Sequence, residues 1–252
     1  MSAAVYSFTA LCMLLCVCSA AFHAGGRIHA ARKCLCAAWW AALALFVADW
    51  ILAAAPPFGN MRHVLAFFPL VMAPAAVYLR RCRGHDLCGW LAAASAIALA
   101  GALCLPLQAH WRQMPALQSP WFVPHVTAYV VAYGLMGVSA MLALASLHSK
   151  TDERLGAADA VARLAFPFMT FGLFSGAIWA DAAWSAYWAW DIKEVWSLVT
   201  WILYLLYFHA HGHAAFAGWR RPLLLLGFAA VLVTFLVVNF MPALNSLHSY
   251  AG

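Results

Sequence analysis

Long apolar runs recur through most of this sequence and restrict it to few architectures. Allowing about 20 residues for each membrane crossing, we count eight apolar segments: roughly 4–22, 37–55, 62–79, 88–107, 122–147, 161–180, 195–210 and 221–240. Because a lipid interior offers peptide groups no hydrogen-bond partner, each segment is expected to be helical. The sequence therefore predicts an all-α polytopic membrane bundle of about eight transmembrane helices.

The composition supports this prediction. Hydrophobic residues make up 67% of the chain and charged residues only 9%, which leaves more apolar surface than a soluble core can bury. The basic residues lie in short clusters between the apolar runs, an arrangement typical of a topology signal and not of a nucleic-acid surface. The eight cysteines form no CxxC pair and are interpreted as small buried hydrophobes.

The connectors on one side of the membrane carry most of the positive charge. Eleven of the 14 Lys and Arg residues follow odd-numbered segments: Arg27, Arg32, Lys33, Arg80, Arg81, Arg83, Lys150, Arg154, Arg163, Arg220 and Arg221. The other side holds Arg62, Arg112 and Lys193. The positive-inside rule therefore predicts both termini and the loop around residues 181–194 on the extracytoplasmic side.

No soluble domain, linker or internal repeat interrupts the chain. We therefore expect one integral membrane domain over residues 1–252, with four N-terminal spans in residues 1–116 and the remaining spans in residues 117–252.

Tryptophan is concentrated in one stretch, where six residues of this type fall between Trp179 and Trp201. Indoles combine a flat apolar face with one N–H donor, so they suit a membrane boundary or a large flat ligand. A boundary belt needs scattered anchors, whereas Trp184, Trp188 and Trp190 lie within seven residues. Residues 181–194 contain no Pro or Gly and are expected to form a short amphipathic helix on the membrane surface.

Three histidines stand out by position. His125 lies just inside the outer end of the fifth segment and His248 lies in the outer tail, so both face the side of the Trp-rich loop. Two such imidazoles could be an axial pair for haem iron, or they could simply make hydrogen bonds at the interface. His209 lies roughly 20 Å into the seventh segment. A polar ring at that depth is a candidate functional group. The alternative is a polar residue at the inner membrane boundary that has no function of its own.

Two segments of the chain carry a resemblance to a known family. The run AWSAYWAWDIKEVWSLVTW that ends at Trp201, followed by YFH at His209, resembles the WWD signature of haem-handling membrane proteins. Its Lys-Glu-x-Trp continuation is similar to the CcsA/ResC branch of System II cytochrome c maturation and differs from the System I relative CcmC. Ser185 and Ile192 stand where this pattern usually has Gly and Pro.

The segments around the two outer histidines also resemble this branch. They read LQSPWFVPHV around His125 and LHSY around His248, so the resemblance covers about residues 117–252. It implies that His125 and His248 are external axial ligands of haem b and that His209 is a ligand of a transit site in the membrane. The implied haem platform consists of Trp184, Tyr187, Trp188, Trp190, Asp191 and Trp196.

The resemblance implies a cytochrome c haem lyase or synthase subunit that acts with a CcsB/ResB-type membrane subunit. Such a protein would pass haem b outward and support thioether attachment to the CxxCH motif of apocytochrome c. It would lie in a bacterial cytoplasmic (inner) membrane with its haem site facing the periplasm. The second transmembrane histidine is expected from the partner, and His23 is only a weak stand-in for it.

Haem propionates are anionic, and the outer side of the predicted topology has few cations. Arg62, Arg112 and Lys193 are therefore candidate propionate partners, although Lys193 could instead pair with Asp191 or Glu194. Two alternative functions stay open: a membrane b-type cytochrome for electron transfer, and a haem exporter without ligation activity.

Overall fold

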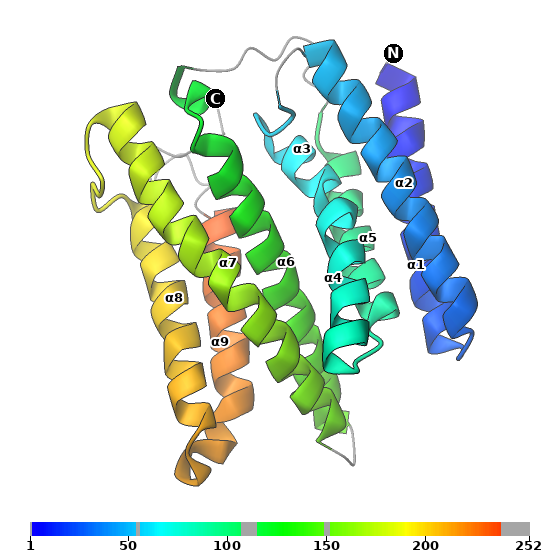
Figure 1. Cartoon of the computed structure of the whole chain (residues 1–252), viewed down its shortest axis with the longest axis vertical. Coiled ribbons are helices and arrows are strands. Elements are labelled where there is room, and N and C mark those ends of the chain that lie inside the picture. The colour runs from blue at the N-terminus through cyan, green and yellow to red at the C-terminus, as the bar shows by residue number, and fades with distance from the viewer. Residues whose placement is uncertain (1, 54–55, 107–114, 149–151, 238–252) are drawn as a thin grey trace. The chain divides into compact units, whose positions relative to one another are not determined.

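The computed structural model describes residues 2–53, 56–106, 115–148 and 152–237 (Figure 1). Every regular element within these ranges is a helix, which confirms the all-α prediction for this part of the chain. The chain divides into two compact units, Met1–Met114 and Pro115–Gly252.

The described residues of the first unit form five helices: α1 (Ser2–Ala24), α2 (Ile28–Ala53), α3 (Met61–Ala66), α4 (Phe68–Arg83) and α5 (Cys88–Cys104). α1 packs against α2 and α5, and α4 packs against α2 and α5. The tight turn between α1 and α2 uses Gly26 at φ +75°, a conformation that residues with a β-carbon rarely adopt.

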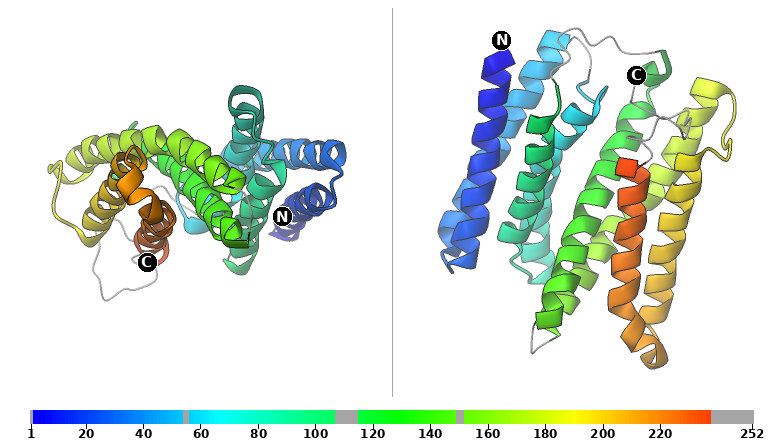
Figure 2. Two further views of the ribbon diagram at one scale, coloured as in Figure 1. Left: turned by 90° about the horizontal axis from the view of Figure 1, so that it is seen from below. Right: turned by 180° about the vertical axis from the view of Figure 1, so that it is seen from behind.

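In the part of the second unit that the structure describes, four longer helices are joined by short helical turns. The longer helices are α6 (Phe122–Ala145), α7 (Glu153–Trp184), α8 (Ile192–His211) and α9 (Arg220–Leu232). The short turns are η1 (Pro115–Gln118), η2 (Ser146–His148), η3 (Ala214–Trp219) and the π-helical turn η4 (Val233–Val237). α6 packs along α7, and α9 packs against α8 and α6 (Figure 2). Fully buried side chains such as Leu135, Met136, Met169 and Tyr204 fill the space between them.

All eight expected segments overlap helices in the described residues, the third falling on both α3 and α4, but eight membrane crossings are not confirmed. Six helical segments in the described residues are long and apolar enough to cross: Val5–Ala24, Ile28–Ile51, Met61–Arg83, Phe122–His148, Glu153–Trp184 and Ala214–Leu236. α5 has only 17 residues. α8 starts with the charged residues Lys193 and Glu194 and is not among the six. The protein is thus a multi-pass membrane protein with about six candidate spans in the described part.

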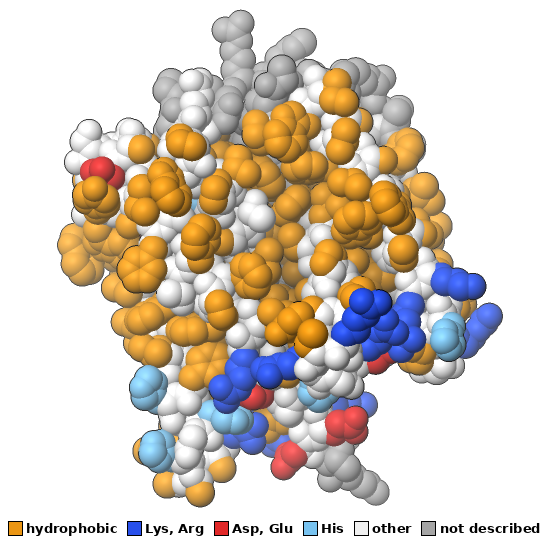
Figure 3. Space-filling view, viewed as in Figure 1, with side chains coloured by type: hydrophobic (Ala, Val, Ile, Leu, Met, Phe, Trp, Pro, Cys, Tyr) orange, Lys and Arg blue, Asp and Glu red, His pale blue; other side chains and the backbone are white. Residues whose placement is uncertain are grey.

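The surface of each unit matches this assignment (Figure 3). Large apolar side chains point outward, including Leu14, Ile51, Ile97 and Phe174, which are 58%, 74%, 65% and 64% exposed. Such exposure would promote aggregation in water, whereas lipid chains solvate it. The Lys and Arg side chains that are visible in this view gather near one end of each unit. The side of the membrane on which these ends lie stays a prediction.

The expectation of a surface helix over residues 181–194 is wrong. α7 continues through Asp181 to Trp184, residues 185–190 are not helical, and α8 begins at Ile192. Ser185 ends α7 in the left-handed conformation, with φ +57°. Asp191 and Glu194 then form a capping box that starts α8. The stretch therefore lacks Pro and Gly but still contains a helix end and a helix start.

Candidate functional site

His125 lies in the first turn of α6, and its position there is fixed by α7. Pro124 precedes it in that turn, where a missing N–H removes no helical hydrogen bond. The Nδ1 atom of His125 lies 2.9 Å from the carbonyl oxygen of Gly172 on α7. Because a carbonyl only accepts, Nδ1 carries the proton, and the lone pair of the neutral imidazole is on Nε2. Nε2 is therefore the ring atom suited to bind a metal ion.

Two glycines of α7 allow α6 to approach this closely. A β-carbon on Gly176 would lie 2.5 Å from Cε1 and 2.7 Å from Nδ1 of His125. A β-carbon on Gly172 would lie 3.1 Å from the ring of Tyr129. Their G-x-x-x-G spacing places both on one face of the helix, as in closely packed membrane helices. The absence of two β-carbons thus creates the seat for the imidazole.

An aromatic chain connects His125 to the Trp-rich stretch. The ring of Trp179 stacks on His125, with centroids 5.4 Å apart and an interplanar angle of 29°. Trp184 meets Trp179 edge-on at 5.0 Å. Trp179 is buried, whereas Trp184 is only half-buried. The last turns of α7 therefore bring the start of the Trp-rich stretch next to His125.

The loop after α7 presents aromatic rings to its surroundings. Tyr187 is 61% exposed and Trp190 is 71% exposed, and Trp188 meets Trp190 edge-on at 6.1 Å. The Nε1–H of Trp188 is buried without a hydrogen-bond partner among the described residues. An unpaired buried donor costs about 1–3 kcal/mol. The loop therefore offers flat apolar faces and one donor that a ligand or partner could satisfy.

The charged residues after the loop hold its backbone. The carboxylate of Glu194 accepts hydrogen bonds from the backbone N–H groups of Ala189, at 2.8 Å, and Asp191, at 3.2 Å. These bonds flank Trp190, which adopts φ +59°, a strained conformation for an aromatic residue. The Asp191 carboxylate accepts from the N–H of Lys193 at 2.9 Å. Asp191 therefore ends the loop and caps the first turn of α8.

Lys193 is half-buried just before the apolar run that starts at Val195. Burial lowers the pKa of its ammonium group from 10.5 to about 8, and the nearby Asp191 carboxylate opposes this shift only in part. An additional anion close to Lys193 would therefore stabilise the charged form.

His209 is exposed on α8, and its Nδ1–H donates to the carbonyl of Leu205 in the same helix at 2.9 Å. Its lone pair is then also on Nε2. Trp196 is half-buried in the first turns of α8. His248 and Arg112 lie outside the described residues.

Arg62 belongs to the first unit, where it is buried by contacts with α1. Its Nη2 donates to Thr9 Oγ1 at 3.3 Å, and its guanidinium lies 4.8 Å from the ring centroid of Tyr6. The described contacts of Arg62 are therefore with the first unit itself.

Sequence reasoning missed the three residues of α7 that position His125: Gly172, Gly176 and Trp179. The G-x-x-x-G spacing in an apolar segment is the available signal, since it marks a face where another helix can approach closely. In the sequence Trp179 is only the start of the Trp-rich stretch, because its contact with His125 follows from helix packing.

The family model described as Cytochrome C assembly protein matches residues 1–245. "Cytochrome c biogenesis protein CcsA" of Thermosynechococcus vestitus is 29% identical, over 95% of this chain and 93% of that protein. CcsA of Chlamydomonas reinhardtii is 35% identical over 152 residues, 54% of this chain and 42% of that protein.

A solved structure, "Cytochrome c Heme Lyase CcmF", is similar with a TM-score of 0.62 at 20% identity. The match covers 92% of this chain but only 44% of CcmF, and it shows a shared fold. The chain belongs to the cytochrome c assembly protein family and is similar to CcsA-type cytochrome c biogenesis proteins.

Proposed function

We propose that this chain moves haem b across a bacterial cytoplasmic membrane and holds it at the outer face for attachment to an apocytochrome c. Membership of the family assigns the chain to cytochrome c maturation and haem handling. The packing of the His125 imidazole against α7 is the observation that carries the proposal. Its Nδ1–H is bound to Gly172, its ring rests on Gly176 and Trp179, and its Nε2 lone pair is directed by these contacts.

His125 and the aromatic residues of the loop after α7 have the chemical groups that a flat iron porphyrin needs. Nε2 is a suitable axial ligand, the exposed faces of Tyr187 and Trp190 can cover an apolar macrocycle, and the buried Nε1–H of Trp188 can donate to a polar group. Haem, when bound, would supply two things: an iron that takes axial imidazoles, and vinyl groups that react with the thiols of a CxxCH motif. His248 is our proposal for the second axial ligand.

The contribution of this chain would be orientation. The G-x-x-x-G face holds the plane of the His125 ring, and the Glu194 carboxylate holds the backbone on both sides of Trp190. Because these groups are ordered by their own packing, a ligand that contacts both of them would be held in one orientation. Such positioning can lower the entropic barrier of the attachment by several kcal/mol without a side-chain nucleophile.

His209 is our proposal for a ligand of a transit site within the membrane. Its side chain is exposed on α8, and its Nδ1–H is already bound to Leu205. An outward Nε2 at membrane depth suits a site completed by a second protein. We propose that a CcsB/ResB-type subunit supplies the other ligand.

Arg112 and Lys193 are our proposed partners of the haem propionates. Lys193 supports this role because its ammonium group is costly to keep charged, so a nearby carboxylate would be favourable. Retention of wild-type haem levels by both Arg112→Ala and Lys193→Ala would refute this assignment.

The test is the pyridine haemochrome and absorption spectrum of the purified protein, compared with His125→Ala and His248→Ala. We expect both variants to lose bound haem and added imidazole to restore it. Unchanged haem content in both variants would refute the proposed ligation.

Reconstitution with the partner subunit and an apocytochrome c then separates the functions. A covalent haem product supports maturation, whereas reversible reduction by quinol without such a product supports a b-type cytochrome. Haem transfer without either reaction supports an exporter.

A further inference from the structure

A cluster of three different metal-ligand types lies in the first unit, whereas His125 and the Trp-rich stretch belong to the second. His23 is in the last turn of α1, Asp86 is in the connector after α4, and Cys88 is the first residue of α5. One ligand atom of each lies within 4.8 Å of the other two. The Sγ atom of Cys88 is 3.4 Å from Nδ1 of His23. Residues from separate elements thus place a thiol, an imidazole and a carboxylate together.

A glycine sets the distance between His23 and Cys88. A β-carbon on Gly89 would lie 2.4 Å from Cβ and 2.5 Å from Cγ of His23, which no side chain tolerates. The last turn of α1 therefore rests directly on the backbone of α5. This close approach brings the imidazole to the thiol and holds it there.

Asp86 is held as an oriented carboxylate. The Arg32 side chain donates to Oδ2 through Nε, at 3.1 Å, and through Nη2, and the N–H of Cys88 lies 3.4 Å from Oδ1. The Arg32 charge and these hydrogen bonds favour the charged carboxylate and fix its orientation. Ligating carboxylates commonly have such an outer partner.

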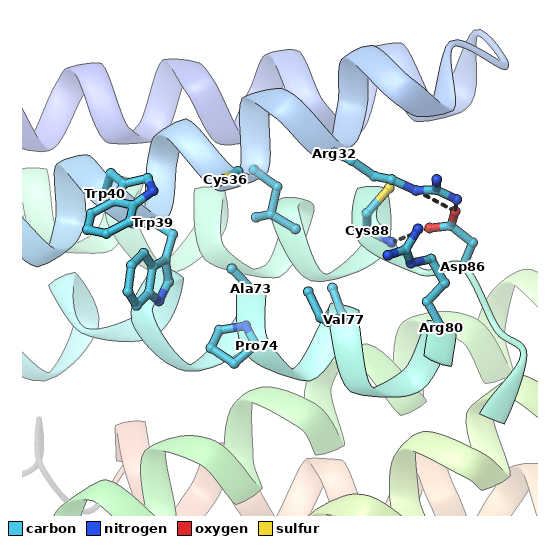
Figure 4. Close-up of a pocket in the computed structure, with 12 residues that line it drawn as sticks. Arg32, Cys36, Trp39, Trp40, Ala73, Pro74, Val77, Arg80, Asp86 and Cys88 are labelled. Atoms are coloured by element: carbon cyan, nitrogen blue, oxygen red, sulfur yellow. Dashed lines mark hydrogen bonds and ion pairs between the residues drawn. The ribbon is translucent and has the colours of Figure 1, made fainter. Parts of the chain in front are cut away.

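A cavity of about 360 Å³ gives access to this cluster. It lies between α2 and α4 and is lined at one end by Arg32, Arg80, Asp86 and Cys88 (Figure 4). In that view the side chain of Asp86 lies close to the two arginines and Cys88. An ion and a water molecule can therefore reach the thiol and the carboxylate.

We propose that His23, Asp86 and Cys88 form a binding site for a thiophilic divalent cation of the Zn²⁺ type. Zinc bonds of about 2.3 Å to sulfur and about 2.0 Å to nitrogen give a tetrahedral S···N edge of about 3.5 Å. The observed 3.4 Å matches this edge. A shift of roughly 1 Å brings the carboxylate into the same coordination sphere.

Coordination replaces the thiol proton with the metal. The S–H bond of Cys88 breaks, a sulfur–metal bond forms, and the proton goes to solvent, so the oxidation state of neither partner changes. The neutral imidazole and the carboxylate donate lone pairs, and a water molecule from the cavity takes the fourth position. The bound ion would join the end of α1 to the start of α5, independently of any haem chemistry in the second unit.

The test uses the haem-free full chain, purified in detergent without a polyhistidine tag and titrated with Co²⁺ as a spectroscopic probe. We expect one equivalent to give a thiolate-to-cobalt charge-transfer band and tetrahedral d–d bands, and Zn²⁺ to displace them. Cys88→Ser should abolish the charge-transfer band, and His23→Gln should weaken binding at least about tenfold. Zn²⁺ should raise the Tm of the wild type but not of Cys88→Ser.

Two variants serve as matched controls. Cys36→Ser removes an exposed thiol that lines the same cavity, and His85→Gln removes a neighbouring imidazole outside the cluster. Both should keep the bands. The proposal is wrong if the wild type shows no thiolate band, if the band survives in Cys88→Ser, or if Cys36→Ser abolishes it.

Discussion

Gly176 of α7 lies directly against the imidazole of His125 on α6. A β-carbon at this position would be 2.5 Å from Cε1, whereas real β-carbons essentially never approach a neighbour closer than 3.0 Å. Any larger residue must therefore displace the ring and its hydrogen bond to Gly172. The orientation of a proposed haem ligand thus depends on a residue that carries no functional group.

Gly176→Ala should reduce haem retention at least about tenfold, the size of effect typical when an outer partner of a metal ligand is disturbed. The added methyl group pushes His125 away from the Gly172 carbonyl, although alanine is intrinsically better in a helix by up to about 1 kcal/mol. The measurement is haem per protein by pyridine haemochrome.

Gly156→Ala is the matched control, because Gly156 lies on the same helix and a β-carbon added there would meet no atom within 4 Å among the described residues. This variant should keep its haem. Wild-type haem retention in Gly176→Ala would show that the glycine does not orient His125.

Trp190→Gly should separate stability from haem retention. Trp190 adopts φ +59° with 71% of its surface exposed, so its backbone is strained while its ring buries little area. Glycine removes a left-handed cost of about 1–2 kcal/mol, partly offset by its greater freedom in the unfolded chain. We expect equal or higher thermal stability in detergent together with weaker haem retention.

Ser185→Gly is the control for this prediction, because it relieves the same kind of strain at φ +57° without removing an aromatic ring. It should keep its haem. Full haem retention in Trp190→Gly would exclude the Trp190 ring from the platform.

The long helices are predictable from the sequence because a membrane crossing needs about 20 apolar residues, a requirement that is local in the chain. The two ends of the Trp-rich stretch are less predictable. α7 extends through the charged Asp181, and the loop depends on Ser185 and Trp190, neither of which is a residue that sequence rules assign to positive φ. Ile192 occupies the first position of α8, which also tolerates proline, so the geometry there accommodates either residue.

Contacts between distant helices are not predictable from one sequence. The position of His125 at the end of an apolar segment singles it out, but its partners Gly172, Gly176 and Trp179 depend on how α6 packs on α7. The interpretation of the cysteines as buried hydrophobes is correct for Cys12, Cys16 and Cys88 but wrong for Cys36, Cys82 and Cys104, which are exposed. The contact of Cys88 with His23 is not predictable, because the two residues are 65 positions apart in sequence.

His209→Ala should leave stability within about 0.5 kcal/mol of the wild type, since the side chain is exposed and its hydrogen bond is to its own helix. It should nevertheless lose the haem held at membrane depth when copurified with the partner subunit. Absorption spectra of the complex and thermal unfolding check the two outcomes.

Tyr207→Phe on the same helix provides the contrast. Tyr207 is fully buried, and its hydroxyl donates to Asp159 Oδ1 at 3.0 Å. Its loss should cost about 1–2 kcal/mol and leave the haem spectrum unchanged. A comparable loss of stability in His209→Ala would assign His209 a structural role.

Lys193 should make the stability of the protein rise with pH in a defined window. Burial lowers the pKa of this ammonium group from 10.5 to about 8 in the folded chain. Between these values the unfolded state binds more protons than the folded state, so the free energy of unfolding increases as pH rises. Below about pH 8 Lys193 is charged in both states, and the full cost of burying its charge reduces stability. Lys193→Met should remove this slope and stabilise the protein below the window, whereas Lys33→Met at an exposed position should keep it. Thermal unfolding across the window measures both effects, and an unchanged profile in Lys193→Met would contradict the assignment.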